Sequence, residues 1–409
     1  MPRLGLLGSC LSMMRVGYFS NLLFFAGIGQ YPVLDSVRAF GTLSLAFSSE
    51  KPDPVTERNL GAETLTYMTK SVPRAALSDG FNAYVGMLGA LYASDYKAIL
   101  IDEPEAFLHP ALARTLGKQI AQQARDKQVF IATHSADFLM GAIEAGENVR
   151  IVRLQYQAGV GRACLLDKDE LRVFMNDPLL RSANVMSGLF SKAVVVGESD
   201  TDRAFYQEIN TRLLAKKDPR GIEGCVFLNA QNKQTVPRIV RLLRRMGVPA
   251  AGIVDLDVLA EGGGVWASQL EALATPEAQK AALEAARLST FSALKAVSTD
   301  VAKKNYKTEG GLKLLDEGTR EAAANLLDTL DAYGLFVVPG GEVEQWLSGL
   351  GVSHAKPSWL RTIFEAMGAN STDVGYVQPA VGDVWDFIGQ ANAWFANPQR
   401  KGMTAIGCP

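Results

Sequence analysis

Short apolar runs alternate with amphipathic stretches through the first half of the chain. Residues 98–101 and 129–132 are apolar and each leads directly into polar residues, as a buried strand does at its end. Residues 78–92 and 111–125 have helical patterns and lie around the first of these runs. Alternating buried strands and helices predict a parallel sheet that is covered on both faces.

A second strand–helix unit begins at residue 192. Its first predicted strand, 193–196, is followed by a turn and by a helix over 201–214. Residues 266–330 are rich in Ala, Leu and Glu and are predicted to be mostly helical. The other expected elements are a strand at 225–228, a helix at 236–246 and strands at 251–254 and 334–338.

The pattern therefore predicts an α/β protein of two domains. We place the boundary between residues 187 and 188, after a stretch of short alternating segments with an expected hairpin at 159–161. Residues 1–187 hold a partial parallel sheet. Residues 188–409 hold a Rossmann-like parallel sheet with a helical insertion over about 266–330 and a helical C-terminal extension.

Composition narrows the class of protein. A chain of 409 residues, 48% hydrophobic and 21% charged, is ordinary for a globular protein of two or three domains. Lys and Arg (41) nearly balance Asp and Glu (43), so nucleic acid would have to be bound by a local basic patch. Four dispersed cysteines without a CxxC spacing favour a reducing compartment. The longest early apolar run, 16–31, is too short to span a membrane, so we expect a cytoplasmic protein without a membrane partner.

Acidic residues follow the first pair of predicted strands. Asp102 and Glu103 come after residues 98–101, and His134 follows residues 129–132. In a nucleotide hydrolase the first acid holds Mg²⁺, the second polarises the attacking water, and a histidine can sense the terminal phosphate. The alternative interpretation of an Asp-Glu pair after a strand is a helix N-cap.

A second set of acids follows the strands of the second unit. Glu198 and Asp202 come after residues 193–196, and Asp255 and Asp257 come after residues 251–254. Glu198 and Asp202 are spaced i, i+4, so their carboxylates can face one way if a helix begins at the turn. Four carboxylates at one sheet edge repel one another unless divalent cations bind, and oxygen ligands suit Mg²⁺ or Mn²⁺. The alternative is two separate N-caps and a solvated turn.

The first set of motifs resembles ABC-type ATPases of the RecF/SMC-like branch. Residues 99–110 (ILIDEPEAFLHP) resemble the Walker B segment, 132–135 (ATHS) the switch-histidine strand, and 77–81 (LSDGF) the signature motif. The resemblance implies that Asp102, Glu103 and His134 act on ATP and Mg²⁺. It also implies that Ser78 and Gly80 contact the γ-phosphate bound by the opposite protomer of a homodimer, as a helix N-terminus suits.

The second set resembles a TOPRIM domain. Glu198-x-x-x-Asp202 matches its first motif and Asp255-x-Asp257 its second, while residues 197–206 (GESDTDRAFY) are similar to those of the OLD (overcoming lysogenization defect) nucleases. OLD proteins carry an ABC-type ATPase followed by a TOPRIM nuclease, which is the order found here. The resemblance implies a divalent-metal-dependent DNA endonuclease with a two-metal mechanism and a setting in phage defence.

Further site residues follow from the same resemblance. Glu344 is similar to the later metal-site glutamate of the family, with Glu342 as a weaker alternative, and Lys356 is a candidate for the lysine that neutralises the cleaved phosphate. Ser199 departs from the pattern, because glycine usually follows the first glutamate. We expect the turn there to be harder to build.

The sequence contains no G-x-x-x-x-G-K-[ST] loop to hold phosphates. Without that loop the affinity of this chain alone for ATP is expected to fall severely, and the ATPase half is expected to be truncated or completed by a partner chain. The alternative function is an ATPase–TOPRIM remnant or subunit that dimerises or binds but hydrolyses nothing by itself. A primase-like or topoisomerase-like activity is a third possibility, but no tyrosine nucleophile or zinc module accompanies the acids.

Basic residues gather just before the second acid pair. Lys233, Arg238, Arg241 and Arg245 are candidates for DNA-backbone contacts, and the three arginines share one helical face. A solvated helix face explains them equally well.

Overall fold

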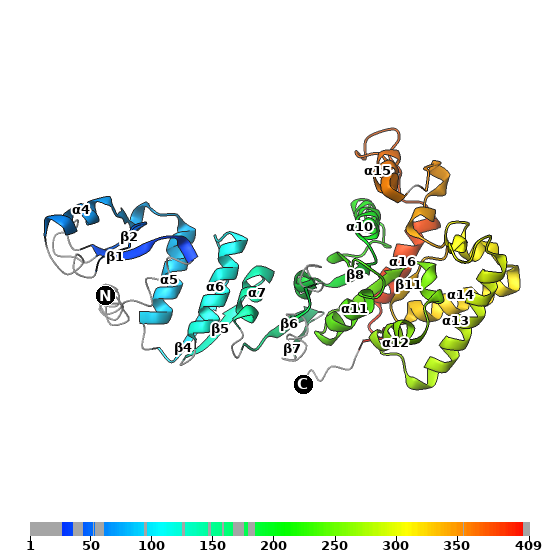
Figure 1. Ribbon diagram of the computed structural model, residues 1–409, viewed down its shortest axis with the longest axis horizontal. Helices are drawn as coiled ribbons and strands as arrows, with labels where there is room; N and C mark the ends of the chain where they lie inside the picture. The colour runs from blue at the N-terminus through cyan, green and yellow to red at the C-terminus, as the bar shows by residue number, and fades with distance from the viewer. Residues whose placement is uncertain are drawn as a thin grey trace. The chain divides into compact units, whose positions relative to one another are not determined.

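The computed structural model divides the chain into two compact units, residues up to Val149 and residues from Arg150 onward (Figure 1). The structure describes residues 27–35, 44–51, 53, 61–93, 96–124, 127–145, 149–157, 159–166, 176–178, 185–354 and 356–403. Most of the apolar run 16–31 lies outside these residues. Within the described part of the chain, no helix combines the length and apolar character that a membrane span requires.

The first unit combines a small antiparallel sheet with a two-stranded parallel sheet. Strands β1 and β2 pair antiparallel, and β3 joins the other edge of β2. Strands β4 and β5 pair in parallel, and Asp102 lies opposite Ala132. The elements are β1 Tyr31–Asp35, β2 Ser44–Ser48, α4 Ala62–Lys70, β3 Val72–Pro73, η1 Arg74–Ala76, α5 Asp79–Ala93, β4 Ala98–Asp102, α6 Pro110–Gln123, β5 Gln128–Ala132 and α7 Ala136–Glu144.

One face of the β4–β5 pair is packed and the other is not. Ile99, Ile101 and the matching residues of β5 pack against a core formed with α5, α6 and α7. On the opposite face Leu100 is 80% exposed and Phe130 is 59% exposed. The expectation that this sheet is covered on both faces is therefore wrong for the described residues, because helices cover only one side of it.

The second unit is built on a four-stranded, fully parallel sheet in the order β11-β10-β8-β9. Each predicted strand is found within a residue of its expected limits. The strands are β8 Ala193–Gly197, β9 Cys225–Asn229, β10 Ala250–Val254 and β11 Leu335–Val337. The helices are α10 Asp200–Ala215, α11 Val236–Arg245, α12 Gly263–Ala272, α13 Glu277–Val297, α14 Glu317–Ala332, α15 Lys356–Met367 and α16 Asp383–Ala396.

Alternate residues of each strand face opposite helical layers. Val195, Ile253 and Phe336 point into a core shared with α10, α15 and α16. On the other face, a Cβ at Gly252 would lie 3.0 Å from Val236 of α11, so α11 approaches the sheet closely there. This two-sided burial explains why the strands read as continuous apolar runs. It confirms the α/β class.

The predicted helical insertion forms α12, α13 and α14 with a non-helical segment between α13 and α14. That segment, residues 298–316, contains only the short 3-10 helices η4 Asn305–Lys307 and η5 Gly311–Leu314. The sequence pattern did not separate it from the helices around it.

The compact units divide earlier than the sequence-based boundary at 187/188. Strands β6 Val152–Gln157 and β7 Val160–Leu165 form the predicted hairpin, which belongs to the second unit. Arg153 fixes it there by donating to the carbonyls of Leu189 (2.7 Å), Gly247 (2.9 Å) and Ser191 (3.1 Å). Residue 188 therefore opens the sheet-forming segment, and its role as a domain boundary stays a prediction.

A buried arginine links segments of the second unit that are far apart in the sequence. Arg244 is 1% exposed and donates to the carbonyls of Ala250 (2.8 Å), Tyr333 (2.8 Å) and Gly402 (2.9 Å). Its guanidinium also lies 4.9 Å from the ring centroid of Trp394. Burial lowers the pKa of Arg244 to about 9, and the three carbonyls compensate for the lost water.

We expect Arg244→Ala to lower the free energy of unfolding by about 3 kcal/mol, because it leaves buried carbonyls without donors. Arg241→Ala is the matched control: Arg241 lies on the same helix in an ion pair with Glu271 that is largely exposed, so its loss should cost less than about 1 kcal/mol. Urea denaturation measures both. Equal costs for the two variants would contradict the role assigned to Arg244.

Candidate metal centre

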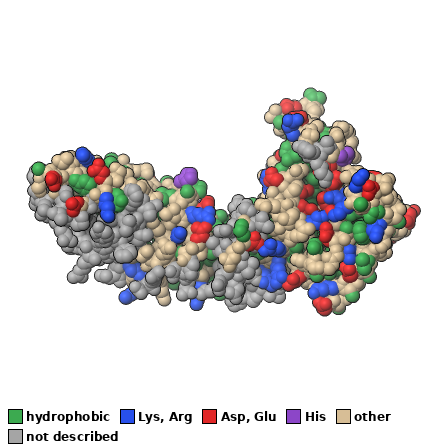
Figure 2. All heavy atoms as spheres, viewed as in Figure 1, with side chains coloured by type: hydrophobic (Ala, Val, Ile, Leu, Met, Phe, Trp, Pro, Cys, Tyr) green, Lys and Arg blue, Asp and Glu red, His purple; other side chains and the backbone are tan. Residues whose placement is uncertain are grey.

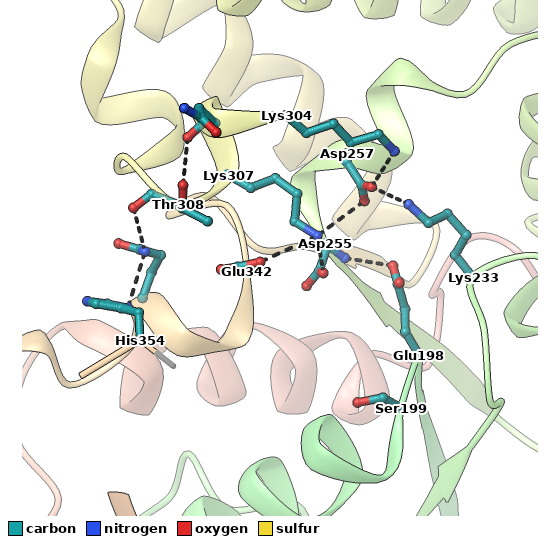
Figure 3. Close-up of polar contacts among 12 residues, drawn as sticks. Glu198, Ser199, Lys233, Asp255, Asp257, Lys304, Lys307, Thr308, Glu342 and His354 are labelled. Atoms are coloured by element: carbon teal, nitrogen blue, oxygen red, sulfur yellow. Dashed lines mark hydrogen bonds and ion pairs between the residues drawn. The ribbon is translucent and has the colours of Figure 1, made fainter. Parts of the chain in front are cut away.

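Three carboxylates meet at the carboxyl edge of the second unit's sheet. Glu198 directly follows β8, Asp255 follows β10, and Asp257 lies in the 3-10 helix η3 Leu256–Ala260. Since β8 and β10 are adjacent and parallel, their ends deliver these side chains to one place. A ligand oxygen from each of the three lies within 4.8 Å of the others, and the Asp255 backbone N–H donates to Glu198 Oε1 at 2.9 Å (Figure 3).

Burial and the charges of neighbouring acids raise the pKa of two of these acids. Burial, followed by the nearby charge of Asp255, raises the pKa of Glu198 from 4.5 to about 8. Burial also raises the pKa of Asp255 to about 6, against the lowering effect of Lys307 and with a further raising contribution from Asp202. Both shifts mean that the charged forms lack sufficient positive charge nearby.

Asp257 behaves in the opposite way because lysines surround it. Burial alone would raise its pKa, but the ammonium groups of Lys307, Lys233 and Lys304 lower it to about 2. Lys233 Nζ lies 2.5 Å and Lys304 Nζ 2.7 Å from Asp257 Oδ2. The other oxygen, Asp257 Oδ1, is buried and has no hydrogen-bond partner among the described residues.

This donor set fits a divalent cation. Carboxylate oxygens are the hard ligands that Mg²⁺ and Mn²⁺ select, and three of them converge here. Asp257 Oδ1 is a buried acceptor that makes no hydrogen bond among the described residues, and an added cation would favour the charged form of Glu198, whose pKa is raised by burial and by Asp255. Glu198, Asp255 and Asp257 would hold such an ion.

Asp202 does not join the other three acids as the i, i+4 spacing suggested. The helix α10 starts at Asp200, after Glu198, so the helical spacing does not connect Glu198 with Asp202. Asp202 instead turns back in a capping box, where Oδ2 accepts from the Ser199 N–H (2.7 Å) and hydroxyl (2.6 Å). Ser199 has an extended backbone as the N-cap of α10, so the departure from glycine makes the turn no harder to build.

Asp202 still belongs to the electrostatic neighbourhood of the acids. It is 6% exposed, and its pKa is raised by burial and by Glu344, against the hydrogen bonds from Ser199. Glu344 is likewise 6% exposed and lies in η6 Val343–Gln345. Glu342, the weaker alternative, lies 3.6 Å from Lys307 Nζ and so is linked to the Asp255 side of the cluster. The ligand roles of Asp202 and Glu344 stay predictions.

Two lysines of the site were missed by sequence reasoning. Lys304 and Lys307 come from the segment between α13 and α14 and contact Asp257 and Asp255 (Figure 3). The sequence indicates them only by their i, i+3 spacing, in a region that the pattern predicts to be mostly helical. Figure 2 shows acidic and basic side chains gathered side by side on this unit.

The predicted DNA contacts lie in different settings. Lys233 is at the acids, 14% exposed at its side chain. Arg238 is ion-paired with Asp177, and Arg241 lies 2.7 Å from Glu271, so both carry a compensating charge. Arg245 stays a candidate on the same helix. The side chain of Lys356 lies outside the described residues, so its assignment also stays a prediction.

The first unit brings its predicted residues together at the ends of β4 and β5. His134 Nδ1 lies 3.2 Å from Glu103 Oε1 and 3.5 Å from Glu105 Oε1. The Thr133 hydroxyl (2.7 Å) and the His134 N–H (3.0 Å) donate to Glu105 Oε1. Asp102 ends β4 opposite Ala132.

The predicted signature residues begin helix α5. Ser78 Oγ accepts from the Phe81 N–H at 3.3 Å, as an N-capping side chain does. A Cβ on Gly80 would lie 2.4 Å from the carbonyl oxygen of Phe107, so only glycine allows this approach. The loop after β4 and the start of α5 are therefore held in contact.

Two family models match separate parts of the chain. Residues 55–141 match "AAA domain, putative AbiEii toxin, Type IV TA system", and residues 189–257 match "Overcoming lysogenization defect protein-like, TOPRIM domain". The second match contains Glu198, Asp202, Asp255 and Asp257. The order of the two matches is that of an ATPase followed by a TOPRIM domain.

A curated relative, the Old nuclease of Escherichia phage P2, is 22% identical over 382 residues, which cover 87% of this chain and 60% of the relative. The chain thus spans about 60% of that protein's length. A chain from a study of ATP-driven dimerization and DNA stimulated activation of SMC ATPases matches at 14% identity. It covers 41% of this chain and 94% of its own, with a TM-score of 0.28, too low to support an inference. The family matches and the relative confirm the resemblance to OLD-type ATPase–TOPRIM proteins.

The raised pKa of Glu198 makes the metal-free protein sensitive to pH. A carboxyl whose pKa rises from 4.5 to about 8 on folding contributes stability that is complete below about pH 4.5 and is lost as the pH rises through about 8. We expect the melting temperature in EDTA to fall across this window, and Mg²⁺ to restore it most at the alkaline end, where the carboxylate is free to bind.

Glu198→Gln removes the titrating group and should flatten the pH dependence relative to the unmodified chain. It should also reduce the Mg²⁺ effect. Parallel melting curves for the two proteins across the window would contradict the assignment.

Proposed function

We propose that this OLD-like ATPase–TOPRIM chain is a divalent-metal-dependent DNA endonuclease that hydrolyses phosphodiester bonds. The observation that carries the proposal is the convergence of Glu198, Asp255 and Asp257 within 4.8 Å at the carboxyl ends of adjacent parallel strands. The name of the relative, Old nuclease, supports the same reaction class. By this resemblance its setting is phage defence.

The residues divide into two groups of ligands. Glu198, Asp255 and Asp257 form the first, and Asp202 with Glu344, whose charges act on each other, is the candidate second group. Divalent cations held there would supply Lewis-acid activation of water and stabilisation of the leaving oxygen. The chain's own residues orient the site: the Asp255 N–H fixes Glu198, and Ser199 fixes Asp202.

A DNA backbone is the substrate that the surrounding charges suit. Lys233 lies at the acids themselves, where it can contact a phosphate. Arg238, Arg241 and Arg245 lie further along the same stretch on α11 and would add contacts that weaken with salt. Sequence-independent binding follows from such contacts.

The ATPase half is proposed to regulate the nuclease or assemble a homodimer. Asp102, Glu103 and His134 would act on ATP and Mg²⁺, and Ser78 with Gly80 would reach the partner's nucleotide. The printed sequence has no phosphate loop, and this favours a second candidate for that half: a module that needs a partner chain to complete the ATP site.

Asp255→Asn combined with Asp257→Asn should abolish nicking of supercoiled plasmid in Mg²⁺ or Mn²⁺. Changes beside a metal ligand cost about 10- to 100-fold, so removing two ligand charges should cost more. The control is Glu321→Gln, an exposed acid on α14. Wild-type nicking by a folded double variant would refute the metal-site assignment, and no nicking by the unmodified chain would favour the non-catalytic remnant.

Glu103→Gln should change neither nicking nor ATP turnover if the chain cannot bind ATP by itself. The physical reason is that a residue that polarises water at the γ-phosphate has no effect when no nucleotide is held. Steady-state phosphate release with and without DNA measures this. ATP hydrolysis that disappears in Glu103→Gln would show instead that the chain completes its own ATP site.

A further inference from the structure

The helical insertion delivers a positive charge into the acid cluster. Lys307 Nζ lies 2.6 Å from Asp255 Oδ2, 3.7 Å from Asp257 Oδ1 and 3.6 Å from Glu342 Oε2 (Figure 3). Its side chain is 12% exposed, so these carboxylates replace most of its water. Two of the three acids it contacts belong to the candidate metal triad.

The backbone around Lys307 is held against the end of the sheet by close glycine contacts. A Cβ on Gly341 would lie 2.0 Å from the Lys307 carbonyl oxygen, and one on Gly311 would lie 2.3 Å from the Pro339 carbonyl oxygen. The Leu312 N–H donates to the same Pro339 carbonyl at 2.9 Å. Gln345 Nε2 also donates to the Thr308 carbonyl at 2.9 Å. The ammonium is therefore aimed by its backbone and does not reach the acids from a loose surface loop.

An ammonium and a divalent cation compete for these acids. Lys307 contacts carboxylate oxygens of Asp255 and Asp257, which are two of the three acids that would hold a metal, and two cations at the same carboxylates repel each other. Lysine is a point charge on a flexible four-carbon stem, so it can leave the carboxylates and find another anion without moving its backbone. In the proposed reaction the anion nearby is the phosphodiester of DNA.

We propose that Lys307 acts as the built-in counter-cation of the acid cluster, is displaced when a divalent cation binds Asp255 and Asp257, and then contacts the phosphodiester of bound DNA. The first half of this inference concerns metal binding alone. The second half rests on the proposed nuclease function.

The first experiment titrates Mn²⁺ into the EDTA-treated full chain by calorimetry at alkaline pH. Lys307→Met should bind Mn²⁺ about tenfold more tightly than the unmodified chain, as loss of one charge-assisted contact worth about 1.4 kcal/mol implies. Lys303→Met is the matched control, since Lys303 lies in the same segment and its side chain is 78% exposed. Its Mn²⁺ affinity should not change. Equal or weaker Mn²⁺ binding by Lys307→Met would overturn the competition.

The second experiment measures plasmid nicking at saturating Mn²⁺. Lys307→Met should nick at least about tenfold more slowly although it binds metal better, because a phosphate contact is lost. Nicking at the unmodified rate would overturn the phosphate contact. If the unmodified chain nicks nothing, the nuclease proposal and this second half both fail, while the calorimetric result still decides the first half.

Gly311→Ala provides a second route should Lys307→Met fail to fold. The added Cβ forces the segment away from Pro339 and withdraws Lys307 while every acid and lysine remains. We expect tighter Mn²⁺ binding and slower nicking again. Gly318→Ala is its control, because a Cβ there has no neighbour nearer than 3.8 Å. Unchanged Mn²⁺ affinity in folded Gly311→Ala would contradict the proposed competition between Lys307 and the metal.

Discussion

Repulsion among buried carboxylates at the carboxyl edge of one parallel sheet is the constraint on which the second unit depends. Parallel strands β8 and β10 end beside each other, so Glu198, Asp255 and Asp257 meet at one edge of the sheet. Burial first, and then the charges of neighbouring acids, raise the pKa values of Glu198 and Asp255. The fold tolerates this repulsion because the sheet is buried on both faces and its strand ends cannot move apart.

Buried and half-buried basic side chains stabilise the second unit, some at the acid cluster and one away from it. Lys233, Lys304 and Lys307 contact the acids directly, and they come from two parts of the chain that only the fold brings together. Arg244 lies further away, where it donates to the carbonyls of Ala250 at the start of β10 and of Tyr333 just before β11. These basic residues therefore have a structural role, which is to bind buried carboxylates and carbonyls.

In the first unit acids also follow parallel strands, but no lysine contacts them among the described residues. Glu103 and His134 are exposed, and Glu105 is held by Thr133 and by backbone rather than by lysine. Among the described residues, the neighbouring sheet face with Leu100 and Phe130 is exposed, whereas a parallel sheet is normally covered on both sides.

The sequence by itself determined the strands of the second unit's sheet and the edge of that sheet at which the acids gather. Continuous apolar runs predicted β8, β9, β10 and β11, because strands buried on both faces need them, and the acids after those runs had to lie at the carboxyl edge. Only the tertiary structure decided how individual side chains are used. Asp202 turned to Ser199, because the capping box at the start of α10 binds its carboxylate locally. Lys307 reached Asp255 across 52 residues, and no local periodicity encodes such a contact, because it depends on glycine approaches between two loops.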